Sequence, residues 1–264
     1  MEFRHFFVKS KSLDYFYMNI LRPLGYYIVL NPGEYWRYFI DRKKFSYLEK
    51  YKNMNKGQRC FIVGSGPSLK KEELEAIKDE IVMGVNSLCL LDNYKKNFDY
   101  FFISDVDAYT RLYDHLPKDT FVSDYCIRKH PELEASNFQP LPVNRYNGFI
   151  PQHRKFSFDI SKIVYDFNSV TFLAIHFALY AGFKEIYLLG VDCNYTTSKI
   201  YSVDHGIRQN PLYMKSQGER MIYNFRFIKD LFDKKNIPVK IYNASTGGML
   251  EVFPRVNLND VLKH

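Results

Sequence analysis

The chain has 264 residues, 46% of them apolar, so it is long enough to bury one large core and does not belong to the disordered class. Its four cysteines lie far apart with no C-x-x-C pair, which argues against a disulfide framework or a zinc site and favours reduced thiols in the cytoplasm. The formal net charge is +8, and residues 1–59 hold twelve Lys/Arg against five Asp/Glu, so nearly all of the excess lies there.

Residues 1–57 form a basic segment rich in aromatic side chains. Apolar residues between positions 13 and 24 follow helical spacing, so we expect a partly helical extension. Such a surface suits anionic membrane headgroups. A helix packed on the main domain explains the pattern as well, and no recognised motif supports a nucleic-acid partner. With charged residues throughout positions 1–12 and only short apolar runs, we expect no signal peptide and a cytoplasmic protein, soluble or peripheral on the inner membrane face.

Residues 59–69 are the most informative segment. An apolar run ends in Gly64-Ser65-Gly66-Pro67-Ser68 and is followed by polar helix-forming sequence, which predicts a strand, a glycine turn and a helix start. Glycines let a backbone approach a ligand, and a helix N-terminus attracts anions, so the loop suits a nucleotide or sugar phosphate. The spacing is neither G-x-G-x-x-G nor a Walker loop, and a tight turn without a ligand is an equal alternative. If the loop binds nucleotide, a bulky side chain at position 66 should block binding and leave the fold intact.

Beyond residue 57 the sequence alternates between predicted strands and helices. The strands are expected at residues 59–63, 80–85, 99–104, 120–122, 185–189 and 239–242. The helices are expected at residues 70–78, 169–181 and 219–234, with a polar loop over residues 194–216. Alternation of this kind requires crossover connections, so residues 58–264 are predicted to form an α/β domain with a doubly wound, mainly parallel, Rossmann-like sheet.

Polar residues follow five of the predicted strands. In chain order they are Ser65 and Ser68, then Asn86, then Ser104, Asp105 and Asp107, then Asp192, Asn194 and Tyr195, and finally Asn243, Ser245 and Thr246. Ligands of open α/β sheets bind beyond the carboxyl ends of the strands. Together these side chains would supply donors and acceptors for a base, a ribose and a phosphate.

Asp105-Val106-Asp107 matches the D-x-D tripeptide of metal-dependent sugar transferases. Such tripeptides arise often by chance. We therefore favour an interpretation in which Asp105 hydrogen-bonds the substrate and Asp107 caps the next helix. No metal or other cofactor is expected.

Among the histidines, His205 is the preferred catalytic base, because it lies in the long polar loop and titrates near neutral pH. An exposed loop histidine without a function is an equal alternative. His176 lies within an apolar helix and is expected to be a hydrogen-bonded core residue, while His153 is a weaker candidate. Tyr195 and Tyr201 could donate hydrogen bonds to a leaving phosphate.

Residues 61–69, 84–86, 181–192 and 241–245 resemble the bacterial 6-hydroxymethylpterin diphosphokinase-like proteins of surface-polysaccharide gene clusters. In the same order they resemble the metal-independent bacterial sialyltransferases that use CMP-sialic acid. The resemblance covers about residues 59–255. It implies that the nucleotide is held by Gly64, Gly66, Pro67, Ser68 and Asn86. One departure concerns the base, because residues 215–220, just ahead of the last long helix, contain no histidine.

The resemblance implies a glycosyltransferase that moves a nucleotide-activated sugar, with a CMP-linked, sialic-acid-like sugar preferred, to a glycan acceptor. The first alternative is a pyrophosphokinase that acts on a hydroxymethylpterin with ATP and magnesium and uses Asp105, Asp107 and Asp192 as metal ligands. The second is a nucleotide-binding module without catalysis, because fold alone does not decide function.

Overall fold

A computed structural model describes residues 21–25, 31–91, 98–145, 154–195 and 211–263. The strands are β1 (Arg59–Val63), β2 (Val82–Val85), β3 (Tyr100–Ile103), β4 (Phe121–Ser123), β5 (Gln139–Leu141), β6 (Val143–Asn144), β7 (Val164–Tyr165), β8 (Glu185–Leu189) and β9 (Lys240–Asn243). The α-helices are α3 (Arg22–Gly25), α4 (Asn31–Ile40), α5 (Lys71–Ala76), α6 (Val106–Leu112), α7 (Asp124–Lys129), α8 (Thr171–Ala181), α9 (Pro211–Lys235) and α10 (Leu258–Val261). The 3₁₀ segments are η3 (Asp41–Tyr51), η4 (Asn86–Leu90) and η6 (Tyr113–His115).

Seven strands form one sheet in the order β5-β4-β3-β2-β1-β8-β9, and every pairing in it is parallel. Strand order reverses between β1 and β8, which are hydrogen-bonded neighbours although they are far apart in the sequence. This confirms the doubly wound α/β fold. A short second sheet pairs β6 with β7.

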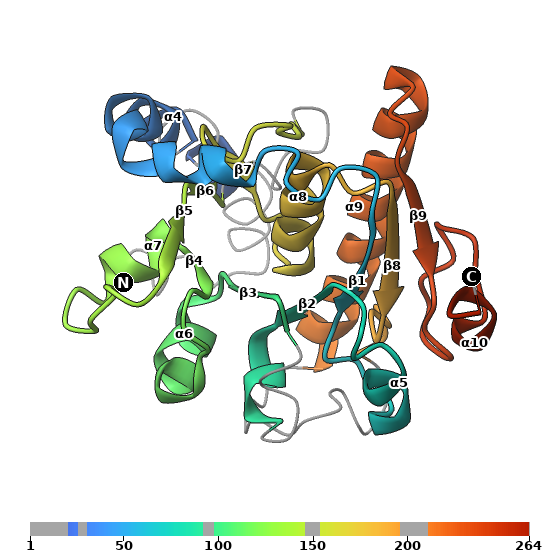
Figure 1. Ribbon diagram of the computed structural model, residues 1–264. Helices are drawn as coiled ribbons and strands as arrows, with labels where there is room; N and C mark the ends of the chain where they lie inside the picture. Colours follow the sequence, from blue (N-terminus) through green and yellow to red (C-terminus); the bar gives the residue numbers. More distant parts are fainter. Residues whose placement is uncertain (1–20, 26–30, 92–97, 146–153, 196–210, 264) are drawn as a thin grey trace.

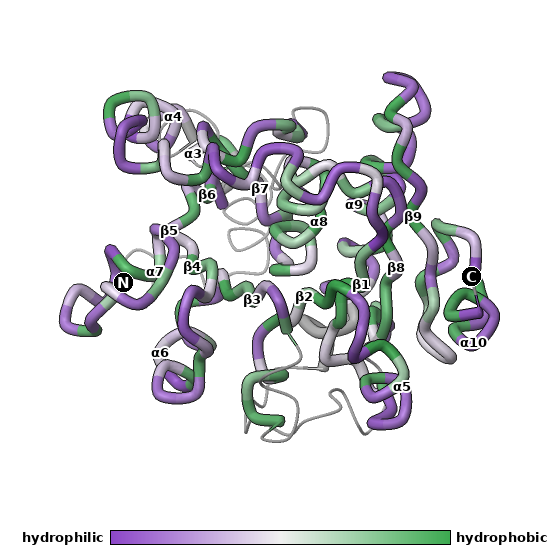
Figure 2. Tube along the Cα trace, viewed as in Figure 1, coloured by the Kyte–Doolittle hydropathy of each residue, from purple (hydrophilic) through white to green (hydrophobic). Residues whose placement is uncertain are grey.

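The strands of the main sheet are buried on both faces, and side chains alternate between two cores. On one face Cys60 and Ile62 pack with η3, α8 and α9. On the other face Phe61 and Val63 pack with α5, α6 and α10. Figure 1 shows these helices on opposite sides of the strands. Figure 2 shows hydrophobic sequence concentrated in the central strands and hydrophilic sequence on outer helices such as α6. Burial on both faces explains why β1 and β8 are continuous apolar runs.

Part of the N-terminal segment belongs to the main core. Tyr38, Phe45, Leu48 and Tyr51 are all at most 8% exposed and pack into the same cluster as α8. The following turn is bonded to the end of α8, since the backbone N–H of Asn53 donates to the Tyr180 carbonyl at 2.9 Å. The predicted boundary between residues 57 and 58 stays a prediction, but these contacts join both sides of it.

The largest difference from the predicted elements is at α9. The helix begins at Pro211, so the predicted loop over residues 194–216 is wrong at its C-terminal end. The helix predicted at residues 219–234 thus starts eight residues too late, and Gly218 lies inside the observed helix. A Cβ at this position would lie 2.3 Å from the Cys193 carbonyl oxygen, so glycine is needed for close packing there. In the described residues, no helix is long and apolar enough to cross a membrane.

Candidate functional site

The glycine loop after β1 packs directly on the chain that follows β8. The backbone N–H of Gly66 donates to the Gly190 carbonyl at 2.8 Å. A Cβ on Gly66 would lie 2.5 Å from that oxygen and 2.7 Å from the carboxylate carbon of Asp192, and a Cβ on Gly64 would lie 2.6 Å from the same oxygen. Both glycines are therefore needed for contact between two loops. The expectation that a bulky residue at position 66 leaves the fold intact is wrong, because the added side chain would collide with backbone.

Asp192 fastens the glycine loop in place. Its carboxylate accepts a hydrogen bond from the Ser68 backbone N–H at 2.8 Å and another from the Ser68 hydroxyl. The Asp192 residue is only 4% exposed. Both oxygens are thus engaged within the protein, and the first effect of Asp192 and Ser68 is to hold the loop in a fixed shape.

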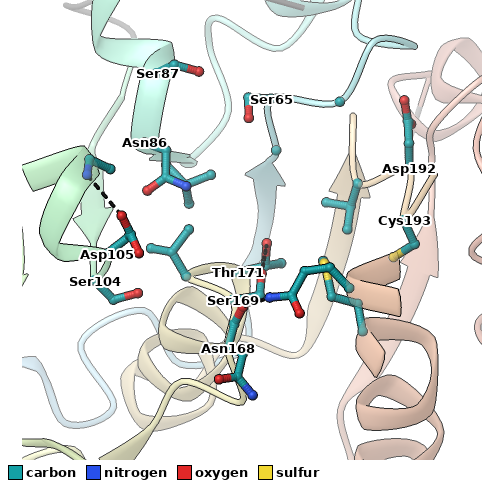
Figure 3. A pocket seen from close by; sticks show the side chains of 18 of the residues that line it. Ser65, Asn86, Ser87, Ser104, Asp105, Asn168, Ser169, Thr171, Asp192 and Cys193 are labelled. Atoms are coloured by element: carbon teal, nitrogen blue, oxygen red, sulfur yellow. Dashed lines mark hydrogen bonds between the residues drawn. The ribbon is translucent and has the colours of Figure 1, made fainter. Parts of the chain in front are cut away.

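A polar pocket of about 220 Å³ lies beyond the carboxyl ends of β1, β2, β3 and β8, at the point where strand order reverses. Figure 3 shows side chains from these strand ends and from the β7–α8 loop around one space. The predicted residues that line it are Gly64, Ser65, Gly66, Pro67, Asn86, Ser104, Asp105, Asp192, Asn194 and Tyr195. Ser68, also predicted to bind the nucleotide, lies outside the lining. Sequence reasoning thus brought together residues from four strands.

Asn243 and Ser245 lie outside the pocket lining. The Asn243 amide donates to the Leu250 carbonyl at 2.6 Å, and the Asn243 side-chain oxygen accepts from the Ser245 backbone N–H at 3.0 Å. The Ser245 hydroxyl accepts from the Val191 N–H at 3.3 Å. Both residues are buried and shape the chain after β9 and β8.

Three pocket residues carry buried polar atoms that have no hydrogen-bond partner in the described protein. They are the side-chain oxygens of Asn86, Ser87 and Gln217. Ser87 is 0% exposed, and sequence reasoning missed it. Leaving a buried polar group unpaired costs about 1–3 kcal/mol, so such groups are retained where something else uses them. All three belong to residues that line the pocket, so a polar ligand bound there is a candidate partner for them.

Backbone strain is concentrated at the same place. Asn86, Asn168 and Cys193 line the pocket and have positive φ angles of 49°, 63° and 52°. The turn at Asn168 is held from α9, because the Gln217 amide donates to the Asn168 carbonyl at 3.1 Å. Left-handed backbone at non-glycine residues costs of order 1–3 kcal/mol and clusters at functional sites.

Arg145 is a half-buried cation of the pocket that sequence reasoning missed. Its Nε lies 3.4 Å from a carboxylate oxygen of Asp166, and its guanidinium lies 4.0 Å from Asp105 and over the Tyr125 ring. Burial raises the pKa of Asp166 above its ordinary value, and the neighbouring guanidinium opposes that rise. Arg145 directly follows the two-residue strand β6, which carries no periodic signal in the sequence.

The helix cap predicted within the D-x-D tripeptide was assigned to the wrong aspartate. Asp105, not Asp107, caps α6, because its carboxylate accepts from the Ala108 N–H at 2.9 Å (Figure 3). Asp107 lies in the first turn of the helix. Across the described residues, no group of three or more His, Cys, Asp and Glu side chains is arranged to hold a metal ion.

The predicted catalytic residues are only partly placed. Tyr195 lines the pocket, and its hydroxyl lies 3.2 Å from the Met221 sulfur. His205, Tyr201 and His153 lie outside the described residues. Within the described chain no histidine lines the pocket. His176 is a core residue, as predicted: it is 0% exposed and lies within hydrogen-bond distance of the Ser157 and Tyr165 carbonyls, at 2.8 and 3.1 Å.

The strand order and the position of the pocket define a doubly wound α/β protein with a polar pocket at its topological switch point. The chain belongs to the 6-hydroxymethylpterin diphosphokinase MptE-like family, which matches over residues 38–198. A solved structure of the MAf glycosyltransferase from Magnetospirillum magneticum AMB-1 aligns with a TM-score of 0.42 and 18% identity, covering 80% of this chain and 37% of that one. The present chain therefore spans little more than a third of that protein. No curated protein matches.

Proposed function

We propose that the protein is a glycosyltransferase that binds a nucleotide-activated sugar in the pocket at the switch point. The observation that carries this proposal is the set of unpaired polar atoms on Asn86, Ser87 and Gln217. A nucleoside presents the hydroxyl and amino groups that would pair with them. The resemblance of the glycine loop and Asn86 to the donor site of CMP-sugar enzymes supports the same assignment.

The phosphate of the donor would lie between Arg145 and the start of α8. Ser169 and Thr171 line the pocket at this 11-residue helix, whose N-terminus favours negative charge. Asp166 orients Arg145 from its buried side, while Asp105, at 4.0 Å, is the weaker partner and the one a phosphate would displace. The arginines of the described lining are the half-buried Arg145 and the exposed Arg111. A site with so few cations suits a monophosphate leaving group, which supports a CMP-linked sugar.

Donor binding without a metal is part of the proposal. Each pocket carboxylate is already engaged: Asp105 caps α6, Asp166 pairs with Arg145, and Asp192 accepts two bonds from Ser68. In this arrangement the carboxylates position protein groups, and the resemblance to the metal-independent sialyltransferases supports donor binding without a metal. Tyr195 and Tyr201 are proposed to stabilise the leaving phosphate, and His205 to take the proton from the acceptor hydroxyl.

The second candidate is the pyrophosphokinase that the family description suggests. It would bind ATP with magnesium and release AMP as it transfers a diphosphate to a hydroxymethylpterin. Its metal would have to draw Asp105 or Asp192 away from the bonds described above. A non-catalytic nucleotide-binding module is the third candidate.

Calorimetric titration separates these candidates. CMP, UDP, GDP and ATP are each titrated in EDTA and in magnesium, and we expect CMP to bind best and equally in both. Arg145→Ala should weaken binding at least tenfold, whereas Arg226→Ala, an exposed arginine on α9, should leave it unchanged. Binding of ATP alone, and only with magnesium, would reject the glycosyltransferase.

Turnover then tests the proposed base. The protein is incubated with CMP-sugar and a mixture of glycan acceptors, and CMP release is followed. His205→Ala should lower turnover by a factor on the order of a hundred while donor affinity stays near normal. Near-normal turnover in this variant would remove His205 from the mechanism, and CMP binding without release in the wild type would favour the non-catalytic module.

A further inference from the structure

Within the described part of the chain, helix α4 packs on the protein through one face and presents large exposed apolar side chains on another. On the covered face Tyr38 donates a hydrogen bond to the Val143 carbonyl at 3.0 Å, and Glu34 forms an ion pair with Arg128 at 2.9 Å. On the other face Trp36, Phe39 and Ile40 are 66%, 67% and 75% exposed. These three residues have i, i+3 and i+4 spacing, so they form one stripe.

The exposed stripe is large for a surface helix. The Trp36 and Phe39 rings meet edge to face with centroids 6.0 Å apart, which makes one continuous aromatic surface. Single exposed apolar residues are ordinary, but a contiguous patch of large ones marks an interaction site. In Figure 1, α4 lies at the periphery, on the side of the sheet away from α5 and α6.

The charge beside the stripe is positive. Arg37, Arg42, Lys43 and Lys44 are exposed within residues 31–44, whereas the acidic residues of that stretch are the buried Glu34 and the exposed Asp41. Lys44 is engaged with Asp124 at 2.5 Å, and Arg37 lies 3.8 Å from Glu34 but keeps 44% of its side chain exposed. Arg37, Arg42 and Lys43 are therefore the exposed cations offered beside the stripe. An apolar aromatic stripe with a cationic border complements an anionic bilayer surface.

We propose that the exposed face of α4 and the start of η3 dock on an anionic lipid bilayer. Trp36, Phe39 and Ile40 enter the headgroup–acyl boundary, where tryptophan is favoured, and Arg37, Arg42 and Lys43 meet the lipid phosphates. This inference does not depend on the reaction proposed for the pocket. It identifies, within the basic N-terminal segment, the side chains that would contact lipid.

The chain provides its own probe, because Trp36 is its single tryptophan. The full-length protein is titrated with vesicles of phosphatidylcholine alone and with vesicles containing 30% phosphatidylglycerol, and tryptophan emission is recorded. We expect a blue shift, and quenching by brominated acyl chains, only with the anionic vesicles. Raising the salt from 0.1 to 0.5 M should weaken binding on the order of tenfold or more.

Variants separate the apolar contribution to vesicle binding from the electrostatic one. Phe39→Ser with Ile40→Ser should weaken vesicle binding at least tenfold, and so should Arg42→Glu with Lys43→Glu. Met54→Ser, which removes another exposed apolar side chain of the same segment, is the matched control and should bind as the wild type does. Thermal unfolding of each variant verifies that the fold is kept, since all of these side chains are exposed.

Two results would overturn the proposal. One is vesicle binding without any change in Trp36 emission, which would assign membrane contact to another part of the chain. The other is a blue shift that depends on protein concentration in the absence of lipid, together with a dimer in sedimentation, which would assign the face to a second copy of the chain.

Discussion

At the scale of single residues, the pocket contains buried polar side chains whose missing hydrogen bonds lower the stability of the folded protein. Ser87 is fully buried next to the left-handed Asn86, and its hydroxyl has no partner in the described chain. Ser123, also fully buried with an unpaired hydroxyl, lies outside the pocket lining, so the position of Ser87 at the pocket is what suggests a role in binding. We therefore expect the Ser87 hydroxyl to contribute to ligand binding more than to the stability of the fold.

Replacing this hydroxyl should separate stability from binding. We expect Ser87→Ala to raise or preserve the free energy of unfolding, because a buried unpaired group is removed, and to weaken nucleotide binding about tenfold. Ser245→Ala is the control, since its bonded hydroxyl supports the Val191 N–H and its loss should destabilise the fold. Urea unfolding and calorimetry measure the two quantities. If Ser87→Ala were destabilised as strongly as Ser245→Ala, the hydroxyl would have a structural role.

Gly66 should prove to be a packing residue. Gly66→Ala places a Cβ 2.5 Å from the Gly190 carbonyl oxygen, so we expect the free energy of unfolding to fall by about 1–3 kcal/mol. Gly33→Ala adds a methyl group where no atom lies within 4 Å, inside α4, and should be neutral or stabilising. Equal urea midpoints for Gly66→Ala and the wild type would show that the two loops separate easily.

Residue chemistry at the strand ends could be predicted because parallel strands bring their carboxyl ends to one edge. That rule located Ser65, Asn86, Asp105 and Asp192 at the pocket. It could not locate Arg145, which follows a strand of two residues and reaches the pocket through tertiary packing. It also assigned the helix cap to Asp107 in place of Asp105, since either aspartate fits an N-cap by sequence alone.

At the scale of elements, α8 is a helix buried on nearly all sides, and it contains a titratable group. His176 lies between the Ser157 and Tyr165 carbonyls and stacks on the Phe156 ring, with centroids 3.9 Å apart. Burial lowers the pKa of His176 to about 4, below its ordinary value of 6.5. The folded protein therefore holds this ring neutral at pH values where the unfolded chain protonates it.

This difference predicts a loss of stability in acid. Between pH 6.5 and pH 4 the unfolded state binds the extra proton, so the free energy of unfolding should fall as the pH is lowered through that window. From pH 7 to pH 5 the contribution of His176 is roughly 2 kcal/mol. His176→Gln, which cannot titrate, should be less stable at pH 7 but lose about that much less on acidification. Urea unfolding at each pH gives the free energy of unfolding of both proteins. If that free energy fell equally with pH in the two, His176 would not be the source of the acid sensitivity.

Strands with a continuous apolar run were predictable, the three-residue β4 among them, and strands without such a run were not. The buried runs of β1 and β8 and the helix α8 have signals that tertiary packing reinforces. The strands β5, β6 and β7 are only two or three residues long, and β5 contains Pro140, which removes a hydrogen-bond donor. Such strands form because of tertiary contacts with neighbouring elements, and the local sequence pattern does not predict those contacts.

At the scale of the whole molecule, the N-terminal segment cannot be separated cleanly at residue 57. Its last part supplies Tyr38, Phe45, Leu48 and Tyr51 to the core that α8 shares, and Tyr51 meets the rings of Phe121 and Phe177 at centroid distances of 5.3 and 5.2 Å. Sequence composition suggested the boundary, because charge and aromatic content change there. Composition does not reveal which aromatic residues are buried.

Truncation tests whether the residues before position 58 are part of the folded core. A chain starting at residue 58 should fail to fold cooperatively, because losing several large buried side chains removes more than the usual net stability of a domain. A chain starting at residue 31 keeps α4 and η3 and should unfold cooperatively. Thermal unfolding followed by circular dichroism distinguishes the two. Cooperative unfolding of the shorter chain would restore the boundary predicted from sequence.

The neighbouring position of β1 and β8 also has a consequence for how the protein is made. The ribosome completes β1 at residue 63, but its partner β8 spans Glu185–Leu189, so one edge of the central strand stays open while residues 64–184 are synthesised. An open apolar edge is a template for pairing with other chains. The nascent protein is therefore most prone to aggregation before residue 189 emerges, and its ligand pocket, which needs both strands, comes into existence only when that edge closes.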